Sequence, residues 1–141
     1  MFREILFNSE DYKKSLALRE EILRVPLGLK LSRHDTSNED KQYHFGIFDQ
    51  SDLVACVVIL PLDLTSVRLR QMAVCTASQG RNIGKCLIQK TEDILSKRGY
   101  KNIEMSARKT VIGFYKKLGY VTDGDGYKLM GIPHIKMYKR I

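Results

Sequence analysis

The sequence contains no long hydrophobic run. Its longest apolar stretch, Leu53 to Leu62, is about half of the roughly 20 residues that a helix needs to cross a bilayer. The sequence therefore predicts no membrane span. The first residues, Met1 to Glu4, have no apolar core behind a basic start, and no small-residue cleavage site follows, so we expect no export.

Cysteine is scarce as well. Cys56, Cys75 and Cys86 are odd in number and too widely spaced for a paired Cys-x-x-Cys framework. Neither a disulfide scaffold nor a thiolate metal site is indicated. We therefore expect free thiols in a reducing cytoplasm and no bound metal.

Acidic side chains are outnumbered by basic ones. The chain has 24 Lys and Arg against 16 Asp and Glu, a net charge of +8. Residues 64–141 hold 16 basic and 5 acidic side chains, whereas residues 34–63 hold 1 and 6. We expect the C-terminal half to bind a polyanion. Composition alone does not decide whether that polyanion is nucleic acid, acidic lipid or a phosphorylated cofactor. The acidic stretch from Asp35 to Asp52 would attract a cationic amine.

The composition, 43% hydrophobic and 28% charged, is that of a folded chain and predicts one domain, 1–141. Apolar periodicity predicts strands at 2–7, 43–48, 53–60, 67–74, 101–106, 120–122 and 134–138, and helices at about 10–24, 83–95 and 111–118. Asn8-Ser9 caps the first helix, and residues 34–41 form a polar, mobile loop. Strict alternation over 67–74 places Gln71 and Ala73 on one face. This order predicts an α/β protein of the mixed α+β kind built on a sheet.

The segment Gln79-Gly80-Arg81-Asn82-Ile83-Gly84-Lys85 connects a predicted strand to a predicted helix. A glycine-containing loop at a helix N-terminus leaves backbone N–H groups unpaired where the helix dipole is positive, and such a loop binds phosphate. On spacing alone, an ordinary strand–helix turn is the alternative. The spacing of Gly80 and Gly84 and the presence of Cys86 exclude a Walker loop, and no dinucleotide fingerprint is present.

This segment resembles the acyl-CoA-binding loop, Gln/Arg-x-x-Gly-x-Gly/Ala, of the GNAT superfamily of N-acetyltransferases. Gln79 and Gly84 match its ends, and Asn82 replaces the middle glycine because Asn accepts left-handed backbone geometry. The flanking segments Leu69 to Val74 and Gly113 to Tyr120 also resemble elements of this family.

Two further segments resemble the ElaA-like subgroup of that superfamily. They are Ala17-Leu18-Arg19 and the tail from Gly131 to Met137. The chain departs from the subgroup at Lys128-Leu129-Met130, where an acidic residue is usual. The similarity nevertheless covers most of the chain.

The resemblance implies a GNAT-like acyl-CoA N-acyltransferase fold. Its central, mostly antiparallel mixed sheet splays between the fourth and fifth strands, here about 67–74 and 101–106, and is flanked by helices. The implied co-substrate is acetyl-CoA, which the splayed strands admit. The residues implied to bind it are Met72, Ala73, Val74, Gln79, Gly80, Arg81, Asn82, Ile83, Gly84, Lys85, Phe114 and Lys117.

The resemblance also implies catalytic roles. It makes Tyr115 the general acid near the CoA sulfur, with a core tyrosine as the alternative. Some family members carry a glutamate base on the fourth strand, but this chain has Arg68 there, which cannot accept a proton. Water, Glu104, His44 or His134 must then act as the base. A covalent acetyl-enzyme on Cys75 is less favoured, because this residue fits a small buried hydrophobe.

We therefore expect an N-acetyltransferase that transfers the acetyl group of acetyl-CoA to a primary amine of a small molecule or an exposed protein amine by direct attack. A catalytically silent acyl-CoA sensor is one alternative. A basic nucleic-acid-binding domain is another, although no helix-turn-helix, zinc-finger or RNA-recognition signature supports it. The expected partners are acetyl-CoA and an amine acceptor, without a membrane, and a homodimer stays an open alternative.

Overall fold

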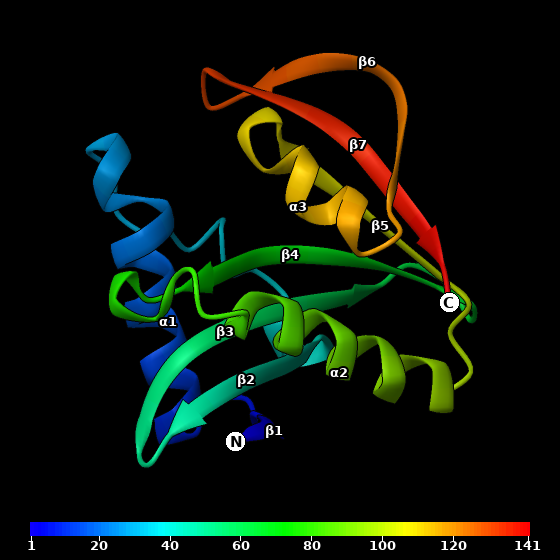
Figure 1. Cartoon of the computed structure of the whole chain (residues 1–141). Helices are drawn as coiled ribbons and strands as arrows, with labels where there is room; N and C mark the ends of the chain where they lie inside the picture. Colours follow the sequence, from blue (N-terminus) through cyan, green and yellow to red (C-terminus); the bar gives the residue numbers. More distant parts are fainter.

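The computed structural model describes every residue from Met1 to Ile141 and contains one seven-stranded sheet in the order β1-β2-β3-β4-β5-β7-β6 (Figure 1). The strands are β1 (Phe2–Glu4), β2 (Tyr43–Asp49), β3 (Asp52–Pro61), β4 (Ser66–Val74), β5 (Asn102–Arg108), β6 (Val121–Leu129) and β7 (Ile132–Arg140). The helices are α1 (Glu10–Leu23), α2 (Ile83–Lys97) and α3 (Ile112–Lys117). The predicted mixed α/β fold is confirmed. No helix combines the length and apolar character needed to span a membrane.

The helix boundaries follow local signals in the chain. Ser9 caps α1, since its hydroxyl accepts a hydrogen bond from the Tyr12 backbone N–H at 3.1 Å. Asn82 precedes α2 with φ 62°, the left-handed geometry expected of an asparagine at that position. The first strand is shorter than predicted, because the chain leaves the sheet after Glu4 and turns at Asn8, which has φ 63°.

The two long helices cover opposite faces of the sheet. Alternate residues of β3, such as Ala55 and Val57, join the main core with Leu87 of α2. The intervening residue Cys56 packs against Leu18 of α1 on the other face. This alternation assigns each strand residue to an α1 face or an α2 face of the sheet. All three cysteines are free thiols.

The sheet opens between β4 and β5, as predicted. These strands pair in parallel only where Ser66 to Arg68 lie opposite Asn102 to Glu104. Beyond this short ladder they diverge (Figure 1), while β5 pairs with β7 along its whole length. The edge of β4 from Leu69 to Val74 therefore has no neighbouring strand on its β5 side.

Strict alternation along β4 was a wrong prediction. The register with β3 shifts between Cys56 and Val58, and Gln71 has φ 47°, so an extra residue bulges out of β4. The bulge reverses the alternation: Met72 packs against the α2 face and Ala73 against α1. A bulge changes the phase of every side chain after it, which no alternating pattern can reveal.

Residues 34–41 and the sixth strand also differ from the predictions. The polar segment includes the 3-10 turn Glu39–Lys41, and its Glu39 side chain is buried. A charged side chain can be buried when an opposite charge pairs with it, and Arg19 pairs with the Glu39 carboxylate. Strand β6 extends far beyond Thr122, because it is an exposed edge strand in which neither face is apolar.

Candidate functional site

A cavity of about 680 Å³ lies where β4 and β5 diverge. Its walls come from α1, the bulged half of β4, the loop before α2, the end of β5, α3 and the hairpin between β6 and β7. The lining residues are Ile22, Leu23, Arg24, Leu69, Gln71, Met72, Val74, Ser78, Gln79, Gly80, Asn82, Ile83, Gly84, Lys85, Met105, Ser106, Ala107, Arg108, Val111, Phe114, Tyr115, Leu129, Met130, Ile132 and His134.

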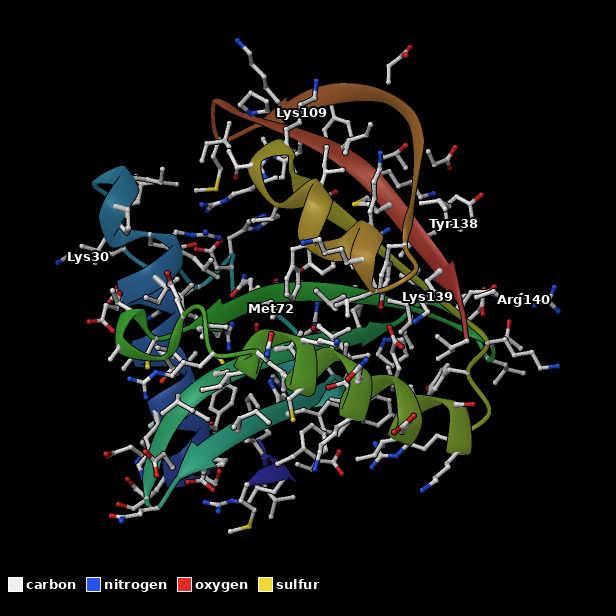
Figure 2. The ribbon with its side chains drawn as sticks, in the orientation of Figure 1. Lys30, Met72, Lys109, Tyr138, Lys139 and Arg140 are labelled. Atoms are coloured by element: carbon white, nitrogen blue, oxygen red, sulfur yellow. The ribbon has the colours of Figure 1, made fainter.

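The α2 side of the cavity is mostly apolar and closely packed. Figure 2 shows Met72 on β4, between α2 and α3. A Cβ atom added to Gly84, in the first turn of α2, would lie 3.0 Å from Met72 Cε and 3.3 Å from Phe114 Cζ. Glycine at this position therefore lets the start of α2 approach β4 and α3 closely.

The start of α2 has a row of unpaired donors. Every backbone N–H from Gly80 to Lys85 lacks an acceptor within the protein, and Asn82 provides no side-chain cap. The positive end of the helix dipole adds to these donors. Nearby, the Gln79 side chain donates to the Val74 carbonyl at 3.0 Å and ties the loop to β4. This arrangement fits a phosphate group, which would satisfy the donors.

Tyr115 places a buried hydroxyl on the same side of the cavity. Its Oη donates to Met72 Sδ at 3.5 Å, and its ring packs edge-on against Phe114 and Tyr120. Burial raises the pKa of Tyr115 well above its usual value, so the hydroxyl stays protonated at neutral pH. A protonated hydroxyl at this point can donate a proton or a hydrogen bond into the cavity.

The α1 side of the cavity carries several polar side chains, among them His134. The His134 Nδ1 atom lies 2.7 Å from the Ile132 carbonyl oxygen. A carbonyl only accepts, so Nδ1 donates in this bond and Nε2 keeps the lone pair of the neutral ring. The Tyr127 ring stacks on the imidazole with centroids 6.5 Å apart. The geometry thus leaves one ring nitrogen able to accept a proton.

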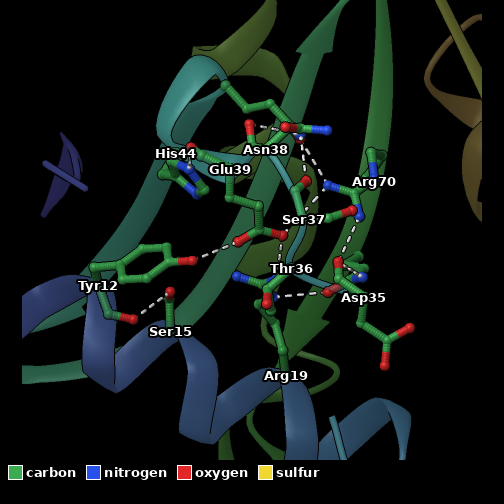
Figure 3. Close-up of polar contacts among 12 residues, drawn as sticks. Tyr12, Ser15, Arg19, Asp35, Thr36, Ser37, Asn38, Glu39, His44 and Arg70 are labelled. Carbon is green, nitrogen blue, oxygen red and sulfur yellow. Dashed lines mark hydrogen bonds and ion pairs between the residues drawn. The ribbon is translucent and has the colours of Figure 1, made fainter. Parts of the chain in front are cut away.

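A buried charge network holds the β4 bulge (Figure 3). The Glu39 carboxylate accepts from Arg19 at 2.5 Å, from Tyr12 Oη at 2.8 Å and from Arg70 at 3.3 Å. Arg19 Nε also donates to the Gln71 side-chain oxygen at 2.9 Å, and the Gln71 amide donates to the Asp35 carbonyl at 3.0 Å. The network therefore fixes the strained residue of the bulge from both ends of its side chain.

The structure brings most of the predicted cofactor-binding residues to this cavity. Met72, Val74, Gln79, Gly80, Asn82, Ile83, Gly84, Lys85 and Phe114 line it, as does the predicted acid Tyr115. Ala73, Arg81 and Lys117 do not. The bulge turns the Ala73 side chain into the core beside α1, whereas Arg81 and Lys117 are exposed outside the cavity.

Two candidate bases lie elsewhere. His44 is buried, its Nε2 donates to the Glu39 carbonyl at 2.8 Å, and burial lowers its pKa. Glu104 lines a separate depression and pairs with Arg68 and Lys136. Neither lines the cavity, and we do not retain either as a base. Among the predicted histidine and carboxylate bases, His134 alone lies at the cavity.

The acidic stretch is not an attractant for amines at the cavity, which contradicts the sequence-based expectation. Glu39 is buried and pairs with Arg19, and Asp35 pairs with Arg24 at 3.0 Å. No Asp or Glu side chain lines the cavity. Glu39 and Asp35 therefore act as internal counter-ions for arginines, whereas Asp40, Asp49 and Asp52 are exposed outside the cavity.

Sequence reasoning missed several lining residues. Arg108 follows the predicted end of the fifth strand, and extending the alternation of Glu104 and Ser106 by two residues would have placed it on the α1 face. Gln71 was assigned to the wrong side because of the bulge. Leu23 ends α1 and Arg24 follows it, and no pattern in the sequence links that helix to β5.

Known proteins are similar to this chain in sequence and in fold. The family description "Acetyltransferase (GNAT) domain" matches residues 29–141. The N-acetyltransferase YitI of Bacillus subtilis, itself uncharacterized, is 28% identical over 131 residues, 88% of each chain.

Two solved structures resemble the fold. ElaA of Escherichia coli superposes with a TM-score of 0.84 and 23% identity, covering 99% of this chain and 98% of its own. A GNAT family acetyltransferase of Elizabethkingia anophelis, solved with acetyl-CoA bound, has a TM-score of 0.77 and 13% identity, covering 100% and 97%. Because the family match spans the diverging strands, the loop before α2 and Tyr115, this chain belongs to the GNAT family of acetyltransferases.

Proposed function

We propose that the protein transfers the acetyl group of acetyl-CoA to a primary amine that attacks the thioester directly. One observation carries this proposal: the cavity between β4 and β5 has unpaired backbone donors and Tyr115 on its α2 side and His134 on its α1 side. Two substrates could meet there from opposite faces of the sheet.

The α2 side is suited to acetyl-CoA. The unpaired N–H groups from Gly80 to Lys85 would bind its phosphates, and Lys85 adds a positive charge. The free edge of β4 from Leu69 to Val74 would pair with the pantetheine amides as an added strand does. The acetyl-CoA bound in the Elizabethkingia anophelis relative supports this assignment.

Two of the titratable side chains at the cavity, His134 and Tyr115, have complementary tasks. His134 Nε2 takes a proton from the attacking amine, whose nitrogen forms the new bond to the acetyl carbon. Tyr115 Oη donates its proton to the sulfur as the carbon–sulfur bond breaks. Between the two proton transfers, backbone N–H groups at the β4 bulge stabilise the oxyanion of the tetrahedral intermediate.

The test is acetyl-CoA-dependent thiol release over a panel of amines, compared for wild type, Tyr115→Phe and the control Tyr138→Phe, whose ring is exposed outside the cavity. We expect Tyr115→Phe to lower turnover by roughly ten- to a thousandfold with little change in acetyl-CoA affinity, because only the hydroxyl is lost. A full rate in Tyr115→Phe at neutral and alkaline pH would refute the general-acid role. Tight acetyl-CoA binding without turnover of any amine would instead favour an acyl-CoA sensor.

A further inference from the structure

We infer that the acceptor is an amino-acid-like amine, with a carboxylate that Arg108 binds and an apolar side chain. This inference rests on the proposed function and names the class of its acceptor. It comes from the charges of the cavity, the pairing of its two arginines and the apolar residues at its α1 mouth.

The charge of the cavity is of one sign. Its charged lining residues are Arg24, Lys85 and Arg108, and no carboxylate lines it; the one carboxylate paired with these cations is Asp35, which binds Arg24 from outside the lining. A polycationic acceptor, such as a polyamine, would meet only repulsion there. An acceptor with its own negative group would be attracted.

Arg108 is the cation available to such a group. It ends β5 on the α1 face, because Met105 and Ala107 turn toward the core on the other face. The only hydrogen bond of its side chain runs from Nη2 to the Leu23 carbonyl at 3.4 Å, and it forms no ion pair. Burial and the neighbouring Arg24 lower its pKa, as expected for a cation without a counter-ion.

Arg24 is already satisfied and serves as the internal comparison. Its Nη2 and Nε atoms both bind the Asp35 carboxylate, at 3.0 and 3.2 Å. The guanidinium of Arg108 has the same planar fork but no such partner. A carboxylate of the acceptor would pair with Arg108 as Asp35 pairs with Arg24.

The position of Arg108 suits a carboxylate close to the amine. Arg108 and His134 are direct register partners on β5 and β7, so their side chains leave the sheet side by side on one face. The proposed proton acceptor and the proposed anion site are therefore neighbours. An amine and a carboxylate separated by a few bonds would reach both.

Apolar side chains form the rest of the α1 mouth. Ile22 and Leu23 come from α1, and Leu129, Met130 and Ile132 come from the tip of the β6–β7 hairpin. Leu129 and Met130 are 43% and 54% exposed and are adjacent at the cavity, so together with Ile132 they form a contiguous apolar surface, the kind that marks a binding site. The apolar side chain of an amino acid would bury this surface.

The test compares matched acids and amides as acceptors: L-leucine with L-leucinamide, and 6-aminohexanoate with 6-aminohexanamide, together with spermidine. We expect the acid to exceed its amide in kcat/KM by ten- to a hundredfold in at least one pair, the size of one charge-assisted contact. In Arg108→Gln this ratio should fall by the same ten- to a hundredfold relative to wild type, whereas the control Lys109→Gln, exposed and outside the cavity, should keep it.

A binding measurement avoids any dependence on turnover. Calorimetry should show that wild type binds N-acetyl-L-leucine more tightly than N-acetyl-L-leucinamide. Arg108→Gln should bind both compounds weakly and with the same affinity. Melting curves of both variants would show that they fold. Equal use of acids and amides, or a preference for spermidine, would overturn the inference while leaving acetyl transfer intact. Absence of thiol release with every amine would count against the proposed function, and the product-binding result would still decide the role of Arg108.

Discussion

Replacing Glu39 by glutamine should destabilise the protein far more than a surface charge change does. The Arg19 side chain is fully buried and its guanidinium relies on the Glu39 carboxylate. A neutral amide would leave this cation, and in part that of Arg70, without a buried counter-charge. Removing one partner of a buried pair costs about 3–5 kcal/mol.

The size of this loss can be converted into a melting shift. An unfolding entropy of about 2.1 cal/mol/K per residue gives roughly 0.3 kcal/mol/K for a chain of this length, so Tm should fall by about 10–17 °C in Glu39→Gln. The matched control is Asp40→Asn, which neutralises the exposed neighbouring residue and should shift Tm by about 2 °C or less.

The assay is thermal and urea unfolding followed by circular dichroism, since the chain has no tryptophan to report by fluorescence. The double variant Arg19→Met/Glu39→Gln removes both charges, and its loss should be smaller than the sum of the two single losses by at least about 1 kcal/mol. Equal melting temperatures for Glu39→Gln and Asp40→Asn, or strictly additive losses, would refute the assignment of Glu39 as the essential counter-ion.

The remaining predictions concern the cofactor side, acid stability and the absence of a covalent intermediate. Gly84→Ala should weaken acetyl-CoA binding, measured by calorimetry, about tenfold, because the new Cβ displaces Met72. The control Gly113→Ala, which has open space around its new Cβ, should leave the affinity unchanged. Equal acetyl-CoA affinities of the two variants would contradict the prediction. The hydrogen bond from Arg24 lowers the pKa of Asp35 to about 2. The stability that the ionised Asp35 gives the folded protein is therefore complete above the unfolded pKa near 4 and is lost as the pH falls toward 2. The stability lost over that window should shrink by about 2 kcal/mol in Asp35→Asn, and an unchanged acid profile would count against the pairing. Cys75→Ala should retain turnover, and an acetyl adduct on Cys75 that forms without acceptor and discharges on adding one would overturn direct attack.

The local signals of the sequence were sufficient for most elements. Ser9 caps α1 as a polar residue before an apolar stripe should, and Asn82 adopts the left-handed geometry that few other residues tolerate. The loop before α2 keeps its donors unpaired because its N-cap residue, Asn82, is in the left-handed conformation and makes no side-chain cap. These features depend on neighbours within a few residues, which is the range over which composition and spacing carry information.

The tertiary structure alone decided which side chains meet. The β4 bulge reversed the faces of Gln71 and Ala73, and it depends on Arg19, which lies 52 residues before Gln71. Glu39 sits in a polar segment and is buried only because arginines from α1 and β4 converge on it. Arg108 and His134 become neighbours through the register of β5 and β7. Such pairings come from strand register and from the burial of paired charges, and these depend on contacts between distant segments that no local pattern encodes.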